Sequence, residues 1–225
     1  MNLGGLIETT REYLDDIAAY SPNTDDLLFS DAQITTQLNR AQERFCELTG
    51  HLLGEFALAV QADVSDYELP SGTIAVVSVK LNDRFIPRYR AQALSGSYSG
   101  SVVGFETDVG MSVLRLVGKP VATDTLRILT QGYPQVAMAV DGDVPEIPPQ
   151  WHLTLCDYAA AKLLRNVNQD TNDSSKAGQF MASFMSDVKD AKSQFHAFAE
   201  SGVRFGTPVN WTRKGGWQWH GGSWW

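Results

Sequence analysis

Seven apolar residues near the end of the chain repeat at alternating spacings of four and three, and this repeat constrains the fold most. An α-helix turns once in about 3.6 residues, so all seven lie along one side of a single helix. Because such a stripe must be buried, the rest of the chain has to supply partners for it. The stripe consists of Ala177, Met181, Phe184, Val188, Ala191, Phe195 and Phe198.

A second helix is predicted just before it, over about residues 150–166, after a short Pro-rich stretch at 145–149. Its apolar residues cover two sides, which is too broad a surface for one partner, so we expect it to lie between other helices. Residues 168–175 are rich in Asn, Asp, Thr and Ser, which favour turns, so the chain should reverse there. The apolar residues of this helix are Trp151, Leu155, Cys156, Tyr158, Ala159, Ala160, Leu163 and Leu164.

Two more amphipathic helices are predicted at the beginning of the chain. The first has a stripe from Leu3 to Ile17 and should end near Ala19, before a Ser-Pro-Asn break. The second begins after Ser30, which forms a capping-box pattern with Gln33, and it should stop at Gly50. Four stripes of one period favour a four-helix bundle. Its predicted core includes Leu38, Phe45, Trp151, Leu155, Phe184, Val188 and Phe195.

The hydrophobic period changes between the two helix pairs. Short β-rich runs are predicted at 56–60, 74–81, 85–89, 112–117 and 125–130, with turn signals between them. Apolar and polar residues alternate in the later runs, as in half-buried antiparallel strands. We therefore expect a small β-sandwich or open barrel inserted between the helix pairs. The Gly- and Ser-rich stretch 95–104 should be a long loop used for contact or left mobile.

The last residues differ from the rest, because they show no helical or strand period. Five of the six tryptophans lie after residue 210, among glycines. A disordered tail is the simplest interpretation of a Gly-rich terminus. Disordered segments are usually poor in aromatic residues, however, so we favour an arm that docks on a partner chain. The predicted partner-binding residues are Trp211, Arg213, Lys214, Trp217, Trp219, Trp224 and Trp225.

These patterns predict an α+β protein with four parts. They are an N-terminal helix pair (1–52), an inserted β domain (53–140), a C-terminal helix pair (141–201) and an extended arm (202–225).

Charge and composition exclude several classes of function. The formal net charge is −8, and the segment 202–225 is basic, so the acidic excess lies in the body. Such a body will not bind DNA by neutralising phosphates. No apolar stretch is long enough to span a membrane, and the beginning does not look like a signal peptide. We expect Cys46 and Cys156 to be buried free thiols in a reducing compartment such as a bacterial cytoplasm.

We find no pattern typical of a catalytic, cofactor or metal site. The four histidines, at 51, 152, 196 and 220, lie far apart, and no phosphate-binding glycine loop is present. Asp157 could be a tuned carboxylate, but such a residue in a helix more often bonds to a neighbouring helix or marks a subunit contact. A basic cluster in the β region suggests a solvated face or a contact between subunits, and less readily a transient DNA contact. It comprises Lys80, Arg84, Arg88 and Arg90.

Three short motifs in this order resemble the head-to-tail adaptor (connector) proteins of tailed bacteriophages, over about residues 3–200. The first is Ser-Asp-Ala-Gln-Ile at 30–34 with Leu-Asn-Arg-Ala-Gln at 38–42. The second is Tyr-Glu-Leu-Pro at 67–70. The third runs from Pro-Glu-Ile-Pro-Pro-Gln-Trp-His at 145–152 to Tyr-Ala-Ala-Ala at 158–161.

The resemblance implies a structural protein of the virion, without catalysis, that assembles in the host cytoplasm. Adaptors of this kind form a ring, commonly of twelve copies, below the portal protein. The ring extends the channel for double-stranded DNA and offers a platform to a tail or nozzle protein, and the C-terminal segment often reaches the portal. An acidic channel wall would repel phosphate and let DNA pass. Another neck or tail-completion protein remains an alternative, as does a small soluble ligand-binding domain or enzyme.

Overall fold

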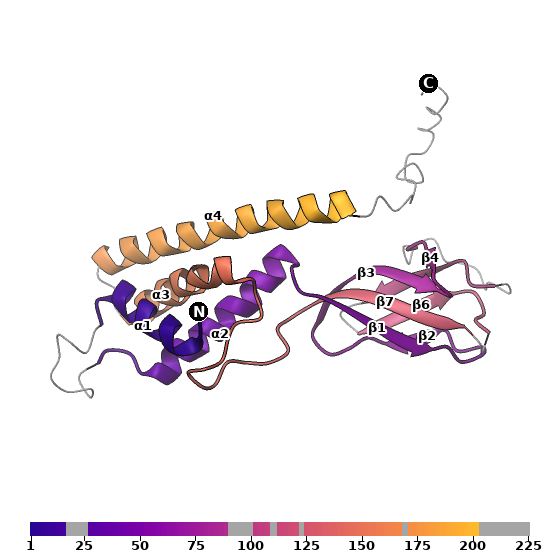
Figure 1. Ribbon diagram of the computed structural model, residues 1–225, viewed down its shortest axis with the longest axis horizontal. Coiled ribbons are helices and arrows are strands. Elements are labelled where there is room, and N and C mark those ends of the chain that lie inside the picture. The colour runs from indigo at the N-terminus through magenta and orange to yellow at the C-terminus, as the bar shows by residue number, and fades with distance from the viewer. Residues whose placement is uncertain (17–26, 90–100, 109–111, 122–123, 168–170, 203–225) are drawn as a thin grey trace, which may run out of the picture.

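The protein is elongated, with its helices at one end and its β-sheets at the other (Figure 1). The computed structural model describes residues 1–16, 27–89, 101–108, 112–121, 124–167 and 171–202. The helices are α1 (Leu3–Leu14), α2 (Asp31–Thr49), the short 3-10 helix η3 (Pro149–Trp151), α3 (His152–Val167) and α4 (Thr171–Gly202). The strands are β1 (Leu53–Ala59), β2 (Asp66–Glu68), β3 (Thr73–Leu81), β4 (Arg84–Ile86), β5 (Gly104–Asp108), β6 (Val113–Val117) and β7 (Thr125–Gly132). An α+β protein with four α-helices and antiparallel sheets is therefore confirmed.

Helix α3 lies among the other three α-helices, and each of them packs against it. The four helices share one apolar core, to which both apolar sides of α3 contribute. Aromatic rings of neighbouring helices meet there, with centroids 6.2 Å apart for Phe45 and Trp151 and 5.0 Å apart for Tyr158 and Phe184. Among the residues expected in the core, Leu38, Phe45, Trp151, Leu155, Phe184 and Val188 are buried and Phe195 is partly buried against them.

Two polar side-chain pairs join α3 to α4 at the edge of this core. The hydroxyl of Thr154 donates to Asp187 at 2.7 Å, and the hydroxyl of Ser183 donates to Asp157 at 2.8 Å. Asp157 thus makes the bond to a neighbouring helix that was the simpler expectation for it. Burial raises the pKa of this carboxyl, while the hydrogen bond from Ser183 acts in the opposite direction.

The ends of α2 form as predicted. The hydroxyl of Ser30 accepts from the backbone N–H of Gln33, and the Gln33 side chain accepts from the backbone N–H of Ser30, which completes the capping box. Gly50 ends the helix with a φ of 64°, in the left-handed region that suits glycine.

Helix α1 is shorter than predicted, because it ends at Leu14 and not near Ala19. Asp15 adopts a left-handed conformation that stops the helix. The next residue, Asp16, then accepts hydrogen bonds from the backbone N–H groups of Leu28 and Phe29. Ile17 and Ala19 lie outside the described residues.

Helix α4 begins earlier than predicted, at Thr171, so the expected hinge over 168–175 was wrong in extent. The residues at 171–175 read Thr-Asn-Asp-Ser-Ser. Such residues favour the first turn of a helix as well as turns, and the sequence alone does not separate the two outcomes.

The strands form two antiparallel sheets around a second apolar core. One sheet has the order β1-β7-β3-β4 and the other the order β2-β6-β5. Strand β4 is shorter than the predicted run at 85–89, and the short strands β2 and β5 were missed. The predicted loop at 95–104 was also too long, because Gly104 begins β5, where an added Cβ would collide with the Tyr89 ring. Residues 95–100 of that loop lie outside the described residues.

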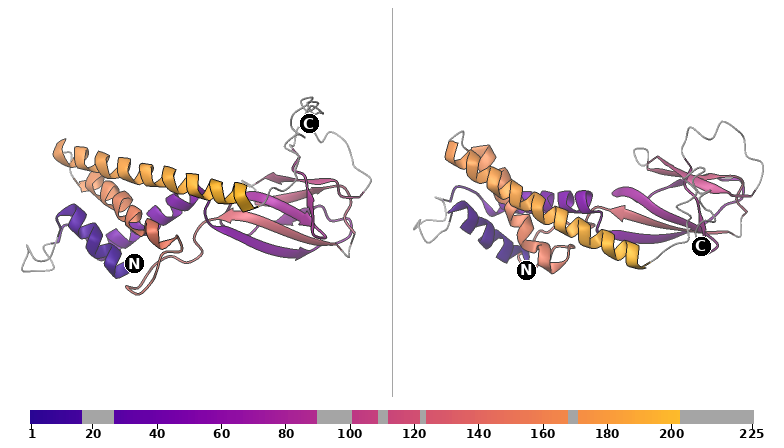
Figure 2. Two further views of the ribbon diagram at one scale, coloured as in Figure 1. Left: turned by 45° about the horizontal axis from the view of Figure 1, so that its top comes forward. Right: turned by 90° about the horizontal axis from the view of Figure 1, so that it is seen from above.

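Two crossings of the chain join the sheets to the helices, and they lie side by side. The backbone N–H of Gly132 donates to the carbonyl of Leu52 at 3.0 Å. The Gln131 side chain fills the space beside Gly50, where a Cβ would come within 2.5 Å of it. The ring of His51 stacks on Phe195 of α4, with centroids 4.2 Å apart. Figure 2 shows the long α4 reaching from the helical part toward this junction.

None of the helices in the described part of the chain is long and apolar enough to cross a membrane.

Replacing Phe184 by Ala should destabilise the protein by roughly 3–5 kcal/mol, because the ring is fully buried and its loss leaves a cavity. Denaturant unfolding measures this change. Met185→Ala is the matched control, because the neighbouring side chain is 47% exposed and should change stability little. Equal stability losses in the two variants would show that the buried face of α4 has been assigned wrongly.

Candidate protein-protein interface

A segment without regular structure, residues 133–148, returns from β7 to η3 along the helices. We call it the strap. Both α1 and α2 hold it in place. The backbone N–H groups of Leu3 and Gly4, which an α-helix leaves without partners at its start, donate to the carbonyls of Asp143 and Asp141. The strap thereby caps α1 and gains a fixed position.

Two polar side chains of α2 complete the attachment of the strap. Asn39 binds the backbone of Met138 on both sides, donating to its carbonyl and accepting from its N–H, each at 2.9 Å. The side-chain carbonyl of Gln42 accepts from the N–H of Glu146 at 2.8 Å. Met138 itself is buried in the core of the helices.

Two carboxylates fold the strap on itself. Asp143 accepts from the backbone N–H groups of Ala139 and Val140, and Glu146 accepts from those of Gln135 and Val136. The backbone hydrogen bonds from Val140 and, to a smaller extent, from Ala139 lower the pKa of the Asp143 carboxyl below its ordinary value.

Three valines of this well-held segment point into solvent. Val136, Val140 and Val144 are 69%, 63% and 59% exposed. Leu153 of α3 and Met1 are exposed as well. Isolated exposed apolar residues need no explanation, but three in one segment with a fixed backbone are typical of a binding surface. The strap is therefore the best candidate interface in the described part of the chain.

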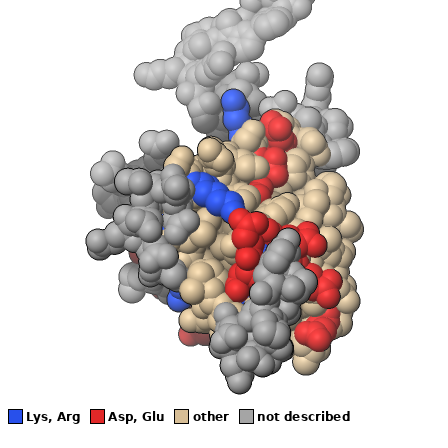
Figure 3. Space-filling view, turned by 90° about the vertical axis from the view of Figure 1, so that its left-hand side faces the viewer, with Lys and Arg blue, Asp and Glu red and all other residues tan. Residues whose placement is uncertain are grey.

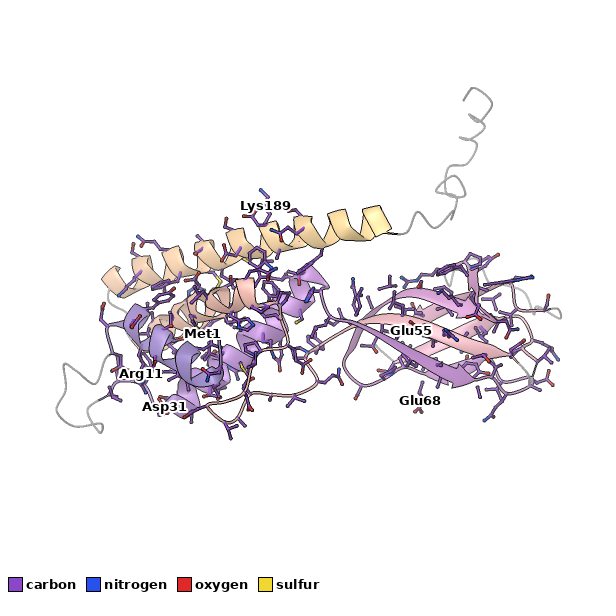
Figure 4. All side chains as sticks on the ribbon, in the orientation of Figure 1. Met1, Arg11, Asp31, Glu55, Glu68 and Lys189 are labelled. Carbon is purple, nitrogen blue, oxygen red and sulfur yellow. The ribbon has the colours of Figure 1, made fainter. Side chains whose placement is uncertain are left out.

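The outer side of α4 carries a second exposed surface, which we call the α4 stripe. Its residues follow one another at spacings of four and three, so they share one face of the helix. The stripe combines two small residues, one large apolar residue and two cations. It consists of Gly178, Ala182, Met185, Lys189 and Lys192, all exposed. Figure 4 shows Lys189 pointing away from the other helices.

Acidic side chains gather at the end of the molecule that carries the end of α1 and the start of α4 (Figure 3). Glu8, Glu12, Asp15 and Asp31 are exposed on α1 and at the start of α2. Arg11 pairs with Asp31 at 2.6 Å, so part of this charge is compensated within the chain. The remaining excess makes this end unsuitable for binding nucleic acid through its phosphates.

One histidine, His152, and both cysteines of the described ranges are buried. The buried ring of His152 contacts the carbonyl of Ile147 at 2.9 Å through Nε2 and the amino group of Met1 at 3.1 Å through Nδ1. Cys46 and Cys156 are free and buried, and burial raises their pKa values to about 12 and about 11, so both remain thiols at neutral pH. No group of residues in the described ranges could hold a metal ion.

The remaining predicted site residues belong to the basic cluster of the β region and to the arm. In the basic cluster, Lys80 lies over the Phe85 ring at 4.8 Å and Arg88 donates to Thr107 at 2.7 Å. Arg90, His196, His220 and every predicted residue of the arm fall outside the residues whose side chains are described.

A hollow of about 270 Å³ lies beside β1 at the junction of helices and sheets. Its lining residues include Phe56, Thr130 and Tyr133.

The sequence reasoning missed the strap, although one signal was available. Three valines at 136, 140 and 144 interrupt a stretch that is otherwise rich in Asp, Gly and Pro. Such a stretch predicts an exposed connection, and apolar residues on an exposed connection indicate a contact surface.

An α+β body whose partly apolar strap is held by hydrogen bonds to α1 and α2 suits a protein that binds other proteins. A family model, that of the SU10 adaptor proteins, matches residues 1–210 of the chain. The chain belongs to this family of phage adaptor proteins, which makes it a structural protein of the virion that contacts other phage structural proteins. No curated protein matches the chain.

Replacing Asn39 by Ala should remove both side-chain bonds to Met138 and lower the free energy of unfolding by roughly 1–3 kcal/mol. The rate of hydrogen exchange should also increase more at the strap amides than at amides elsewhere in the chain. Arg40→Ala, at the next and exposed position of α2, is the control. Unchanged exchange in the Asn39 variant would mean that the strap is held by other contacts.

The strap should loosen in acid through Asp143. Because the folded-state pKa of this carboxyl is lower than its ordinary value of 3.8, its stabilising effect is complete above that value and is lost as the pH falls through the lowered pKa. In an NMR titration against pH, the chemical shifts of the Ala139 and Val140 amides should change as the Asp143 carboxyl becomes protonated. In the Asp143→Asn variant, these amide signals should no longer show a transition with pH. A transition that persists in this variant would come from another titrating group.

Proposed function

We propose that this protein is a head-to-tail adaptor that forms a ring below the portal and presents a docking platform to a tail or nozzle protein. The family supports the adaptor role. The observation that carries the proposal from the structure is the strap, whose exposed valines stand on a backbone held by α1 and α2. A surface fixed before it binds loses little conformational entropy on binding, which suits assembly.

The parts of the chain take separate roles in this proposal. Within the limits 1–52 and 141–201, the helices act together as a four-helix bundle, a wedge that packs beside its neighbours around the ring. The inserted domain, 53–140, projects from the wedge, as its place at the other end of the molecule suggests (Figure 1). The arm, 202–225, reaches to the portal through its tryptophans. Twelve copies is the number that the family resemblance implies.

The charge of the body supports passage of DNA without capture. Exposed carboxylates repel phosphates, so a ring of such subunits would hold DNA in its channel without binding it tightly. The function proposed is mechanical and involves no catalysis, cofactor or metal. The protein would act in the virion at the junction of head and tail, after assembly in the host cytoplasm.

A chain that ends at Gly202 tests the proposal. It should keep the fold, because every described contact of the core lies before this residue, and it should lose binding to the portal protein of the same phage. Pull-down with portal and a thermal melt measure the two properties. The full-length chain with Trp211, Trp217 and Trp219 replaced by Ala is a second variant and should also bind portal weakly. Unchanged portal affinity in both variants would exclude the arm as the attachment.

The position in the particle needs a separate measurement. An antibody to this chain should label the neck of purified particles in electron micrographs. Labelling at the tail tip or on the capsid would instead favour another structural role.

A further inference from the structure

We propose that the strap of one copy binds the α4 stripe of the neighbouring copy in the ring. This inference deepens the proposed function and rests on it, because it identifies which two surfaces of the chain meet. The occupant of each surface is a second copy of this chain.

The two surfaces have opposite charge. The strap contains Asp141, Asp143 and Glu146 and no Lys or Arg. The α4 stripe contains Lys189 and Lys192 and no acidic residue; the nearby Asp190 lies about 100° around the helix from Lys189. In the described part of the chain, no ion pair holds either of these two lysines. The pairing would thus join charges that the single chain leaves apart.

The two surfaces also match in shape and polarity. The valines of the strap project from an irregular backbone, and the stripe offers Met185 beside the small residues Gly178 and Ala182. Small residues let another backbone approach the helix closely, so the valines could cover Met185 and leave the lysines at the rim. An apolar centre with a charged rim is the usual arrangement of a protein interface.

The positions of the surfaces fit a ring. The strap and α4 lie on opposite sides of the helical part, with α4 along the upper side and the strap along the lower side in Figure 1. The left view of Figure 2 keeps this separation. A patch on one side that binds a different patch on the opposite side of the next copy gives a head-to-tail contact, which closes into a ring when the rotation allows. Contact between identical patches would stop at a dimer.

Cross-linking in assembled particles tests the contact. Particles are prepared with the double variant Val140→Cys/Met185→Cys and treated with a short bismaleimide. The native thiols Cys46 and Cys156 are buried, so they should not react. We expect a ladder of cross-linked products that extends beyond the dimer on a denaturing gel. Each single variant alone should give only monomers, because strap and stripe come from different copies.

The control pair is Val121→Cys/Met185→Cys. Val121 lies outside the strap and is 59% exposed, the same fraction as Val144, and this pair should give no ladder. A second set of variants tests the charges. Lys189→Glu should reduce the ladder of the Val140/Met185 pair at least tenfold, and addition of Asp141→Lys to the same chain should restore it.

The outcomes separate this inference from the proposed function. Particles that contain the protein at the neck but give no ladder would overturn the contact and leave the adaptor role intact. Dimers from either single variant would also overturn it, because they would show a patch meeting itself. The contact would also be overturned if the control pair gave a ladder as strong as that of the Val140/Met185 pair. Particles that lack the protein would overturn the adaptor role and the contact together.

Discussion

Burial of α3 among the other three helices is the interaction on which the rest of the structure depends. Its alanines, Ala159, Ala160 and Ala161, are fully buried, and residues of this size let neighbouring helices approach closely. The helices that cover α3 also carry the strap, since α1 and α2 supply its hydrogen bonds. Helix α4 covers α3 with one face and presents the α4 stripe on another. The core therefore sets the position of both candidate surfaces.

The strap has no regular secondary structure, yet many hydrogen bonds hold its backbone. Its backbone groups bond to the start of α1, to Asn39 and Gln42 of α2, and to its own carboxylates. Each bond is worth only about 1 kcal/mol, but together they leave the backbone few alternatives. Its valines are consequently held in place although nothing in the described chain covers them.

The helices could be predicted from the sequence because their signals are local. The stripes of α2 and α4 and the capping box at Ser30 need only neighbouring residues to be recognised. The end of α1 could not be predicted in this way, because Asp16 bonds to the backbone of residues 28 and 29, which are distant in the sequence. Strand β2 has only three residues, and β5 begins in a Gly-rich stretch, so neither shows enough alternation. The strap depends on partners 99 positions apart, Asn39 and Met138, and no local pattern records such a contact.

The distribution of charge connects the single chain to the assembly. Several basic side chains are used within the chain, as in the pairs Arg11–Asp16, Arg115–Asp66 and Lys176–Asp15. The last two pairs are exposed and add little stability, but all three cancel charge locally and leave the surface net acidic. Free copies with a net charge of −8 repel one another at low ionic strength. A contact that joins the lysines of α4 to the acidic strap would offset this repulsion at the interface while the rest of the surface stays acidic toward DNA. The net charge thus opposes random association of copies, while the proposed contact would favour the one orientation in which opposite charges meet.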